Sequence, residues 1–225
     1  MPRKPPSRWQ RDPEGMRQRI LDAARAEFAK RGSDGARIDR IARAAKANKR
    51  MLYYHIGNKD ALYLAALEGA YEHIRDAERK LNLEALAPAD AITRLIEFTW
   101  DYFLENPEFM ALLNNENLHR ARHLKRSKKV KQMHSPFVAL LADILRKGVA
   151  SGAFRSNVDP VQLYITIASL SYFYLSNNAT LSTIFGRDLM GEDAKAERVA
   201  HMTDLVLAAL RRGSTAKLDR LVAAS

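Results

Sequence analysis

The chain has 225 residues, of which 47% are hydrophobic, and it contains no cysteine. This length can bury a substantial core, and because no apolar run approaches the ~18 residues of a membrane span, we expect a soluble, cytoplasmic protein without membrane contact. Without cysteine the chain can form neither a disulfide, nor a thiolate metal site, nor a cysteine nucleophile.

The net charge of +11 is concentrated near the N-terminus. Residues 1–60 contain 16 Lys and Arg against 7 Asp and Glu, whereas residues 61–225 contain 21 against 19. A generally basic protein would spread its excess charge more evenly. The asymmetry therefore predicts a compact nucleic-acid-binding module joined to a nearly neutral domain.

Residues 1–14 contain four prolines and four basic side chains with almost nothing apolar to bury, which predicts a flexible basic arm. Arg3, Lys4, Arg8 and Arg11 could add phosphate or minor-groove contacts on DNA binding. The alternative is a terminus that only improves solubility.

An amphipathic helix is predicted over about residues 16–31, because Ile20, Ala24 and Phe28 recur at four-residue spacing and Gly32 follows as a stop. Glycine, serine and aspartate dominate residues 32–35, which predicts a loop.

Residues 37–59 have the pattern of two short helices joined by a tight turn, which predicts a helix-turn-helix. The first helix has an apolar face of Ile38, Ile41, Ala42 and Ala45, and the second has one of Leu52, Tyr53 and Ile56. Asn48 is a suitable N-cap for the second helix, which then begins Lys49-Arg50-Met51. In a DNA-binding helix-turn-helix, side chains at this N-terminus reach base edges in the major groove.

The run LYYHIGNKDAL at residues 52–62 resembles the signature of the tetracycline-repressor (TetR) family, and IARAA at residues 41–45 resembles it as well. The resemblance implies that Tyr53, His55 and Lys59 hold DNA phosphates. It also implies that the three residues after Asn48 face the bases. The complete predicted DNA-binding set is Arg37, Asn48, Lys49, Arg50, Met51, Tyr53, Tyr54, His55 and Lys59.

Two residues depart from the family pattern. Lys46 stands where the family usually has a turn glycine, and Arg37 where it usually has a Ser or Thr cap. A non-glycine residue in a left-handed turn costs roughly 1 kcal/mol, so Lys46 weakens the motif without breaking it.

After residue 60 the sequence has only helical periods, which predicts an all-α protein. A linking helix is expected to about residue 80, and five or six helices are expected in the body. Body helices are predicted at about 88–105, 108–123, 135–151, 160–178 and 192–212. We therefore divide the chain into an arm at 1–14, a three-helix DNA-binding domain at 15–62, a helical body at 81–212 and a tail at 213–225.

The segments 160–178 and 194–212 are unusually apolar, which favours a dimer interface, although a buried core is the alternative. The family resemblance implies that the last two long helices of each subunit form a four-helix homodimer interface. A helix-turn-helix that binds a palindrome needs such a two-fold partner.

Aromatic and amide side chains alternate in the body, as in a small-molecule pocket, although bundle cores are lined in the same way. The resemblance implies an effector pocket. Its predicted residues are Trp100, Phe103, Phe109, Met110, Leu113, Asn114, Asn117, His123, Phe137 and Tyr172. The segment NNENLH at residues 114–119 resembles the corresponding sequence of family members that regulate the catabolism of aromatic compounds or N-heterocycles. We therefore expect an aromatic or heterocyclic effector.

Glu116 and His119 have the Glu-x-x-His spacing of di-iron bundles. The motif occurs once, whereas a di-iron site needs two copies and further carboxylates, so we expect no metal and no cofactor. A helix-face pair with Arg120 would explain Glu116 without a function. The basic run at residues 120–131 is interpreted as a solvated loop, with attraction of an anionic effector or contact with DNA as alternatives.

These features predict a dimeric, ligand-responsive transcriptional regulator that binds a palindromic double-stranded DNA operator and is not an enzyme. The family resemblance implies that it acts as a repressor. The alternative from another functional class is an architectural DNA-binding protein whose body serves only dimerisation.

Overall fold

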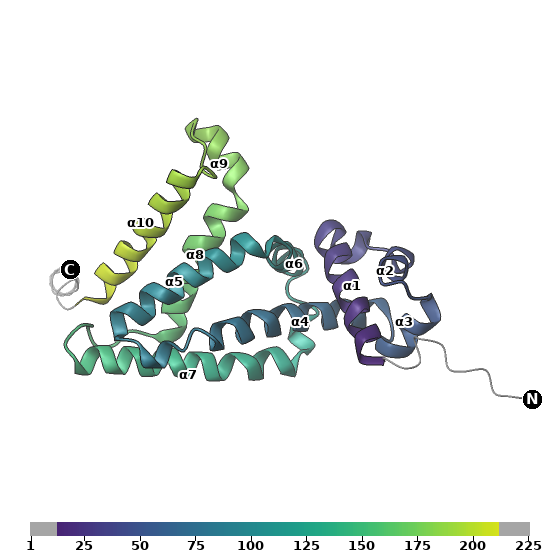
Figure 1. Cartoon of the computed structure of the whole chain (residues 1–225), viewed down its shortest axis with the longest axis horizontal. Helices are drawn as coiled ribbons and strands as arrows, with labels where there is room; N and C mark the ends of the chain where they lie inside the picture. Colours follow the sequence, from purple (N-terminus) through teal and green to yellow (C-terminus); the bar gives the residue numbers. More distant parts are fainter. Residues whose placement is uncertain (1–12, 212–225) are drawn as a thin grey trace, which may run out of the picture. The chain divides into compact units, whose positions relative to one another are not determined.

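The computed structural model describes residues 13–211, and these residues form ten α-helices and two short 3-10 helices (Figure 1). The predicted arm, with Arg3, Lys4, Arg8 and Arg11, lies outside the described residues except for its last two positions. The predicted tail lies outside them entirely. Among the described residues no strand occurs, which confirms the all-α prediction.

The helices belong to two compact units. The first contains the described residues up to His73 together with Pro107–Lys131. The second contains Ile74–Asn106 and the described residues from Gln132 onward. The division into domains at 15–62 and 81–212 stays a prediction.

The first unit is built on α1 (Pro13–Gly35), α2 (Ile38–Ala44), α3 (Lys49–Ile56) and the first part of α4 (Lys59–Arg79). The α1 side chains Ile20, Ala24 and Phe28 are fully buried, and α1 packs against α2, α3 and α6 (Pro107–Leu118). Burying a side chain such as Ile or Phe contributes about 1.5–3 kcal/mol. The predicted apolar face of α1 is therefore the face that holds the helix-turn-helix together.

Gly32 interrupts α1 as predicted, since its backbone at φ 69° and ψ 175° is not helical. The prediction of a plain loop at residues 32–35 is wrong, however, because α1 continues beyond the break at Gly32 and ends at Gly35.

The second unit contains the end of α4, α5 (Pro88–Glu105), most of α7 (Lys128–Ala150), α8 (Pro160–Ser176), α9 (Asn178–Phe185) and α10 (Glu192–Leu210). The α5 helix packs against α8 and α10, and α8 and α10 contact each other. Ile92 and Leu95 of α5 and Met202 of α10 are completely buried. In Figure 1 the short α9 connects the ends of α8 and α10.

Two predicted boundaries in the body are wrong, and one helix was missed. The α6 helix (Pro107–Leu118) ends earlier than residue 123, because Arg120 and Ala121 have φ values of 54° and 56° and the chain turns there. The α7 helix begins at Lys128 rather than near residue 135. The helix α9 was not predicted at all.

The early start of α7 has a local cause in Ser127. Its hydroxyl accepts a 3.1 Å hydrogen bond from the Val130 N–H and donates one of 2.6 Å to the Glu68 carboxylate. A serine in this position caps a helix N-terminus. In the same turn Lys129 Nζ lies 2.9 Å from Glu72 Oε2. The interpretation of the basic run as a solvated loop is therefore wrong for its last residues, which form the first turn of α7.

Candidate DNA-binding site and helical body

The turn between α2 and α3 has the backbone that the sequence predicts. Lys46 has a φ of 52°, which is the left-handed conformation normally taken by glycine. Asn48 caps α3, since its side-chain oxygen accepts a 2.8 Å hydrogen bond from the Met51 N–H. Arg37 precedes α2 in an extended conformation and makes no side-chain cap.

The first turn of α3 presents an exposed basic surface. Lys49 and Arg50 are exposed, Met51 is half-buried, and Leu52 is buried against the neighbouring helices. Tyr53 and Tyr54 follow with 48% and 85% of their surfaces exposed. Large aromatic side chains this exposed are typical of a surface that binds a partner.

Two of the predicted DNA-contacting lysines have partners in the free protein. Lys49 Nζ lies 2.6 Å from Asp39 Oδ1, and this hydrogen bond and the carboxylate charge raise the pKa of Lys49. Lys59 Nζ donates a 3.1 Å hydrogen bond to the backbone carbonyl of Asp34. Both cations are therefore held at the surface.

Glu27 of α1 anchors the start of α2. Its Oε1 accepts a hydrogen bond from the Arg37 N–H and another from the Arg40 guanidinium, each at 3.2 Å, and Arg31 lies 3.4 Å away. Burial acts to raise the pKa of Glu27, but these hydrogen bonds and the charges of Arg31 and Arg40 outweigh it, and the pKa is lowered. The helix-turn-helix is thus braced by a carboxylate whose importance sequence reasoning missed.

A second brace comes from α6, through Asn115. Its Oδ1 accepts hydrogen bonds of 2.9 Å from the Ser33 N–H and from the Tyr63 hydroxyl. A β carbon on Gly32 would lie 2.4 Å from Asn115 Nδ2, so the glycine also makes room for this amide. The predicted neighbours Asn114 and Asn117 are exposed instead.

His123 and Glu116 form a buried pair at the end of α6, with His123 Nδ1 2.9 Å from Glu116 Oε2. Glu116 Oε1 also accepts the backbone N–H groups of His123 and Leu124. The interpretation of Glu116 as a partner of Arg120 on the helix surface is therefore wrong. Among the described residues no group of three or more His, Asp or Glu side chains could hold a metal ion.

The remaining predicted effector residues lie in both units. In the first unit Phe109 is buried, with its ring 5.5 Å from that of Tyr71, while Met110 and Leu113 are half-buried. In the second unit the buried rings of Trp100, Phe103 and Phe137 meet other aromatic rings. Their ring partners are Tyr174 at 5.5 Å, Tyr172 at 6.5 Å and Tyr164 at 5.0 Å, respectively.

Sequence reasoning missed a buried charged pair in the second unit. Arg75 and Glu78 lie one turn apart near the end of α4, each with 3% of its side chain exposed, and Arg75 Nη1 lies 2.9 Å from Glu78 Oε2. The pattern of α4 could not identify them, because an i, i+3 pair of opposite charge usually lies on a helix surface.

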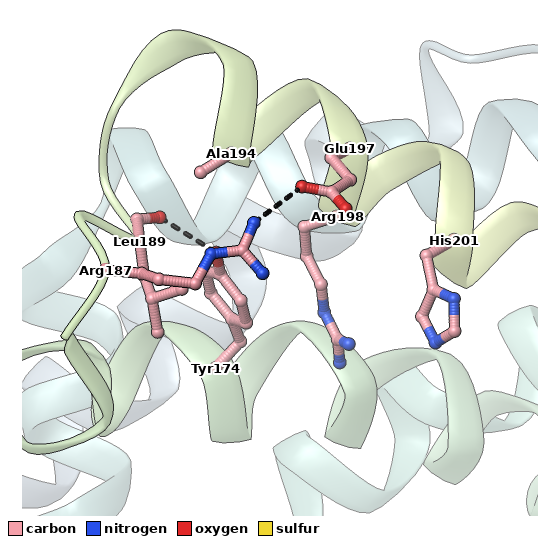
Figure 2. Close-up of a pocket in the computed structure, with 7 residues that line it drawn as sticks. All are labelled: Tyr174, Arg187, Leu189, Ala194, Glu197, Arg198 and His201. Carbon is pink, nitrogen blue, oxygen red and sulfur yellow. Dashed lines mark hydrogen bonds and ion pairs between the residues drawn. The ribbon is translucent and has the colours of Figure 1, made fainter. Parts of the chain in front are cut away.

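Three hollows of the second unit adjoin α10, one of them of about 340 Å³ beside the start of α8. A wide groove of about 640 Å³ runs between α5 and α10, and the predicted residue Trp100 contributes to its wall. A smaller pocket of about 170 Å³ lies between α8 and α10. Figure 2 shows Arg198 and His201 extending from α10 toward α8, and Arg187 paired with Glu197 at 3.3 Å.

The small pocket is already held together by the protein itself. The guanidinium of Arg198 lies 5.0 Å from the centre of the Tyr174 ring and donates a 2.8 Å hydrogen bond to the Leu170 carbonyl. The Tyr174 hydroxyl donates to the Leu189 carbonyl. A volume of 170 Å³ is below the ~300–1,000 Å³ of ordinary ligand pockets.

The helices α8, α9 and α10 expose a group of large apolar side chains. These are Val161, Ile165 and Phe173 of α8, Ile184 and Phe185 of α9, and Leu205 of α10. Several large apolar side chains exposed on neighbouring helices are typical of protein–protein interfaces.

Comparison with known proteins places this architecture. Residues 20–66 match the family model described as bacterial regulatory proteins of the tetR family. Residues 88–206 match the model described as the tetracyclin repressor-like C-terminal domain. The chain belongs to the TetR family. Its helix-turn-helix is accordingly a DNA-binding element, and the protein is a transcriptional regulator rather than an enzyme.

Relatives within the TetR family cover nearly the whole chain. The HTH-type transcriptional repressor NicS of Pseudomonas putida is 40% identical over 196 residues, which are 87% of this chain and 92% of NicS. The structure of the transcriptional regulator SCO4942 of Streptomyces coelicolor matches with a TM-score of 0.65 at 25% identity, covering 88% of this chain and 99% of that one.

A second solved structure that matches is that of FadR from Bacillus subtilis in complex with stearoyl-CoA. It matches with a TM-score of 0.64 at 14% identity and covers 87% of this chain and all of FadR. At this identity the match concerns the fold. Among the described residues, no helix has both the length and the apolar character needed to cross a membrane.

Proposed function

We propose that this protein is a homodimeric repressor in the cytoplasm that binds a palindromic operator through α3 and leaves it when a small organic effector binds the helical body. The observation that carries the proposal is the first turn of α3, where Lys49 and Arg50 are exposed directly after the Asn48 cap. A helix held in this way places its N-terminal side chains in the major groove.

The proposed roles divide the DNA-binding residues into two groups. Lys49, Arg50 and Met51 contact base edges, while Tyr53, Tyr54, His55 and Lys59 contact phosphates, with Arg37 at the start of α2 supporting them. Phosphate contacts fix the register of a protein on DNA, and base contacts select the sequence.

Dimerisation is supported by the exposed apolar side chains of α8, α9 and α10. Two recognition helices must lie about 34 Å apart to enter successive major grooves, which requires a two-fold partner. In a homodimer each subunit would contribute this same apolar surface, which is the arrangement of an isologous interface.

Release by an effector is supported by the contacts of α6 inside the first unit. Asn115 holds Ser33, and Arg122 and His119 lie 3.6 and 3.8 Å from the carboxylate of Asp34. A shift of α6 would therefore displace the turn that precedes α2. A tenfold loss of operator occupancy requires only about 1.4 kcal/mol of preference for the released state.

The test is to enrich genomic DNA fragments on the purified protein, to locate the bound site by footprinting, and to screen organic acids, amides and heterocycles for release. The proposal predicts a palindromic footprint and at least one compound that lowers occupancy. Tight binding without sequence preference, unaffected by every compound, would favour the architectural alternative.

A further inference from the structure

The buried pair of Arg75 and Glu78 is an unusual feature of the second unit. Charged side chains are almost never fully buried unless they are well paired, because losing their hydration costs several kcal/mol per ion. Here both side chains lie inside the part of the body formed by the end of α4, α7 and α8.

Arg75 is surrounded by aromatic rings. Its Nη2 donates a 2.7 Å hydrogen bond to the Tyr164 hydroxyl, and its guanidinium carbon lies 4.4 Å from the centre of the Phe137 ring and 5.2 Å from that of Tyr164. Cation–π contacts of this kind hold a guanidinium in a fixed position without occupying its N–H groups. The side chain is therefore well placed but incompletely bound.

Several polar atoms of the pair have no hydrogen-bond partner. Arg75 Nε and Nη1 make no hydrogen bond, and neither do Glu78 Oε1 and Oε2, because the 2.9 Å ion-pair contact lacks hydrogen-bond geometry. A buried polar atom left without a partner costs about 1–3 kcal/mol, and more when it is charged. Such atoms in a native structure call for a missing partner.

The protonation state of Glu78 indicates which charge the missing partner should carry. Burial raises the pKa of Glu78 to about 8, although the charge of Arg75 opposes the rise. At neutral pH Glu78 therefore mostly keeps its proton, and the Arg75 charge is left without a full counter-charge. Burial also raises the pKa of Tyr164, so the phenol remains a hydrogen-bond donor.

We propose that Arg75 and Tyr164 bind the carboxylate group of an organic-acid effector, and that the Glu78 side chain occupies this position in the free protein. The inference rests on the proposed function, which it narrows to carboxylic acids. The Arg75 N–H groups that make no hydrogen bond can donate charge-assisted hydrogen bonds to the oxygens of a carboxylate. The Tyr164 hydroxyl, which already accepts from Arg75, donates its proton to the same group.

A purely structural pair predicts a different pattern. In that case Glu78 and Arg75 would provide each other's hydrogen bonds. A ligand carboxylate would then bind no more tightly than an uncharged group of the same shape. Replacing Glu78 would then only weaken the protein. In the proposal, removing the internal carboxyl group vacates its position and improves ligand binding.

The experiment uses the full-length protein and two pairs of probes of matched shape, benzoate with benzamide and octanoate with octanamide. Binding is measured by calorimetry and by thermal shift at neutral pH. We expect at least one acid to bind roughly tenfold or more tightly than its amide. Glu78→Ala, which vacates the position held by the internal carboxyl group, should strengthen binding of that acid severalfold, and Tyr164→Phe should weaken it.

The double variant Arg75→Met/Glu78→Gln removes the cation without leaving a buried charge, so it should fold and bind acid and amide equally. Arg79→Met, on the exposed side of the same helix, is the matched control and should keep the preference. Equal binding of acid and amide by the unaltered protein, or an unchanged preference in the double variant, would overturn the inference.

Operator release is measured separately from binding. If some other compound releases the operator while neither acid is preferred over its amide, the inference fails and the proposed function stands. If an acid binds through Arg75 but does not change operator occupancy, the carboxylate site is real and the proposed effector response fails.

Discussion

The Oδ1 atom of Asn115 accepts a 2.9 Å hydrogen bond from the hydroxyl group of Tyr63. Because the same atom accepts the Ser33 N–H, one side chain of α6 joins the start of α4 to the end of α1. Ser33 and Tyr63 are both buried, so these donors have no ready access to water. The amide therefore contributes to the stability of the whole DNA-binding unit.

Asn115→Ala should lower the free energy of unfolding by about 1–3 kcal/mol, because it leaves two buried donors without an acceptor. Denaturant unfolding measures the change. The control is Asn117→Ala, on the exposed surface of the same helix, which should stay within about 0.5 kcal/mol of the unaltered protein. Equal effects of the two variants would show that the Asn115 contacts contribute nothing.

Lys59→Ala and His55→Ala should weaken binding to every DNA sequence to a similar extent, whereas Lys49→Ala and Met51→Ala should change the preferred bases. Binding to the operator and to variants with single base changes measures both effects. Lys80→Ala, an exposed cation beyond the end of α4, is the control. A change of base preference in Lys59→Ala would reverse the assigned roles.

Operator affinity should decrease steeply with salt, because each phosphate neutralised by the protein releases a counterion. With about 6 to 10 phosphate contacts per dimer, affinity should decrease roughly 10³- to 10⁵-fold between about 50 and 200 mM salt. Fluorescence anisotropy at several salt concentrations gives the slope. A slope near zero would exclude the proposed set of phosphate contacts.

Phe173→Asp or Leu205→Asp should convert the dimer into monomers that bind a palindrome weakly, because each places a charge among apolar side chains of the proposed interface. Phe173 is 59% exposed and Leu205 47%, so neither change disturbs the core. Sedimentation reports the mass of the particle. Val149→Asp on α7, where Val149 is 38% exposed, should stay dimeric. If both interface variants stayed dimeric and bound the operator with full affinity, the interface would lie elsewhere on the protein.

Stability should decrease as the pH rises from about 4.5 toward 8, through the titration of Glu78. The folded protein keeps this proton up to a pKa of about 8, whereas the unfolded chain loses it near the ordinary value of 4.5. Between these values the folded state binds the extra proton, so the slope of stability for this group is negative and reaches at most about 1.4 kcal/mol per pH unit.

Glu78→Gln removes the titrating carboxyl group and should flatten this decrease, as measured by unfolding at several pH values. Arg75 lies beside this carboxyl group, and burial raises the pKa of Tyr164, which also faces it, so the phenol keeps its proton over this range. Glu84→Gln, an exposed carboxylate in the same unit, should leave the slope unchanged. An identical slope in Glu78→Gln would assign the pH dependence to other groups.

Local signals explain why the DNA-binding unit could be predicted from the sequence. The cap at Asn48, the left-handed turn at Lys46 and the break at Gly32 depend on neighbouring residues, and the structure confirms each of them. The bounds of α5 and α10 were predictable for the same reason, since prolines, glycine and acidic residues mark their ends.

The body was harder to predict because its polar contacts connect distant segments. Glu116 turns inward to cap the chain at His123, and Ser127 starts α7 by pairing with Glu68, which lies 59 residues earlier. Neither contact leaves a periodic pattern. The charged pair of Arg75 and Glu78 was missed because its spacing is that of a surface pair. The assigned DNA-binding and effector residues stay predictions.

The close approach of Asn115 to Gly32 has a consequence for how the two positions vary among homologous proteins. A side chain at position 32 would collide with the amide and would also be strained by the positive φ angle there. A homologue with a larger residue at position 32 would need a smaller one at position 115, together with another acceptor for the donors that Asn115 now serves. The two positions should therefore covary in an alignment, although they are 83 positions apart in the chain (115 − 32).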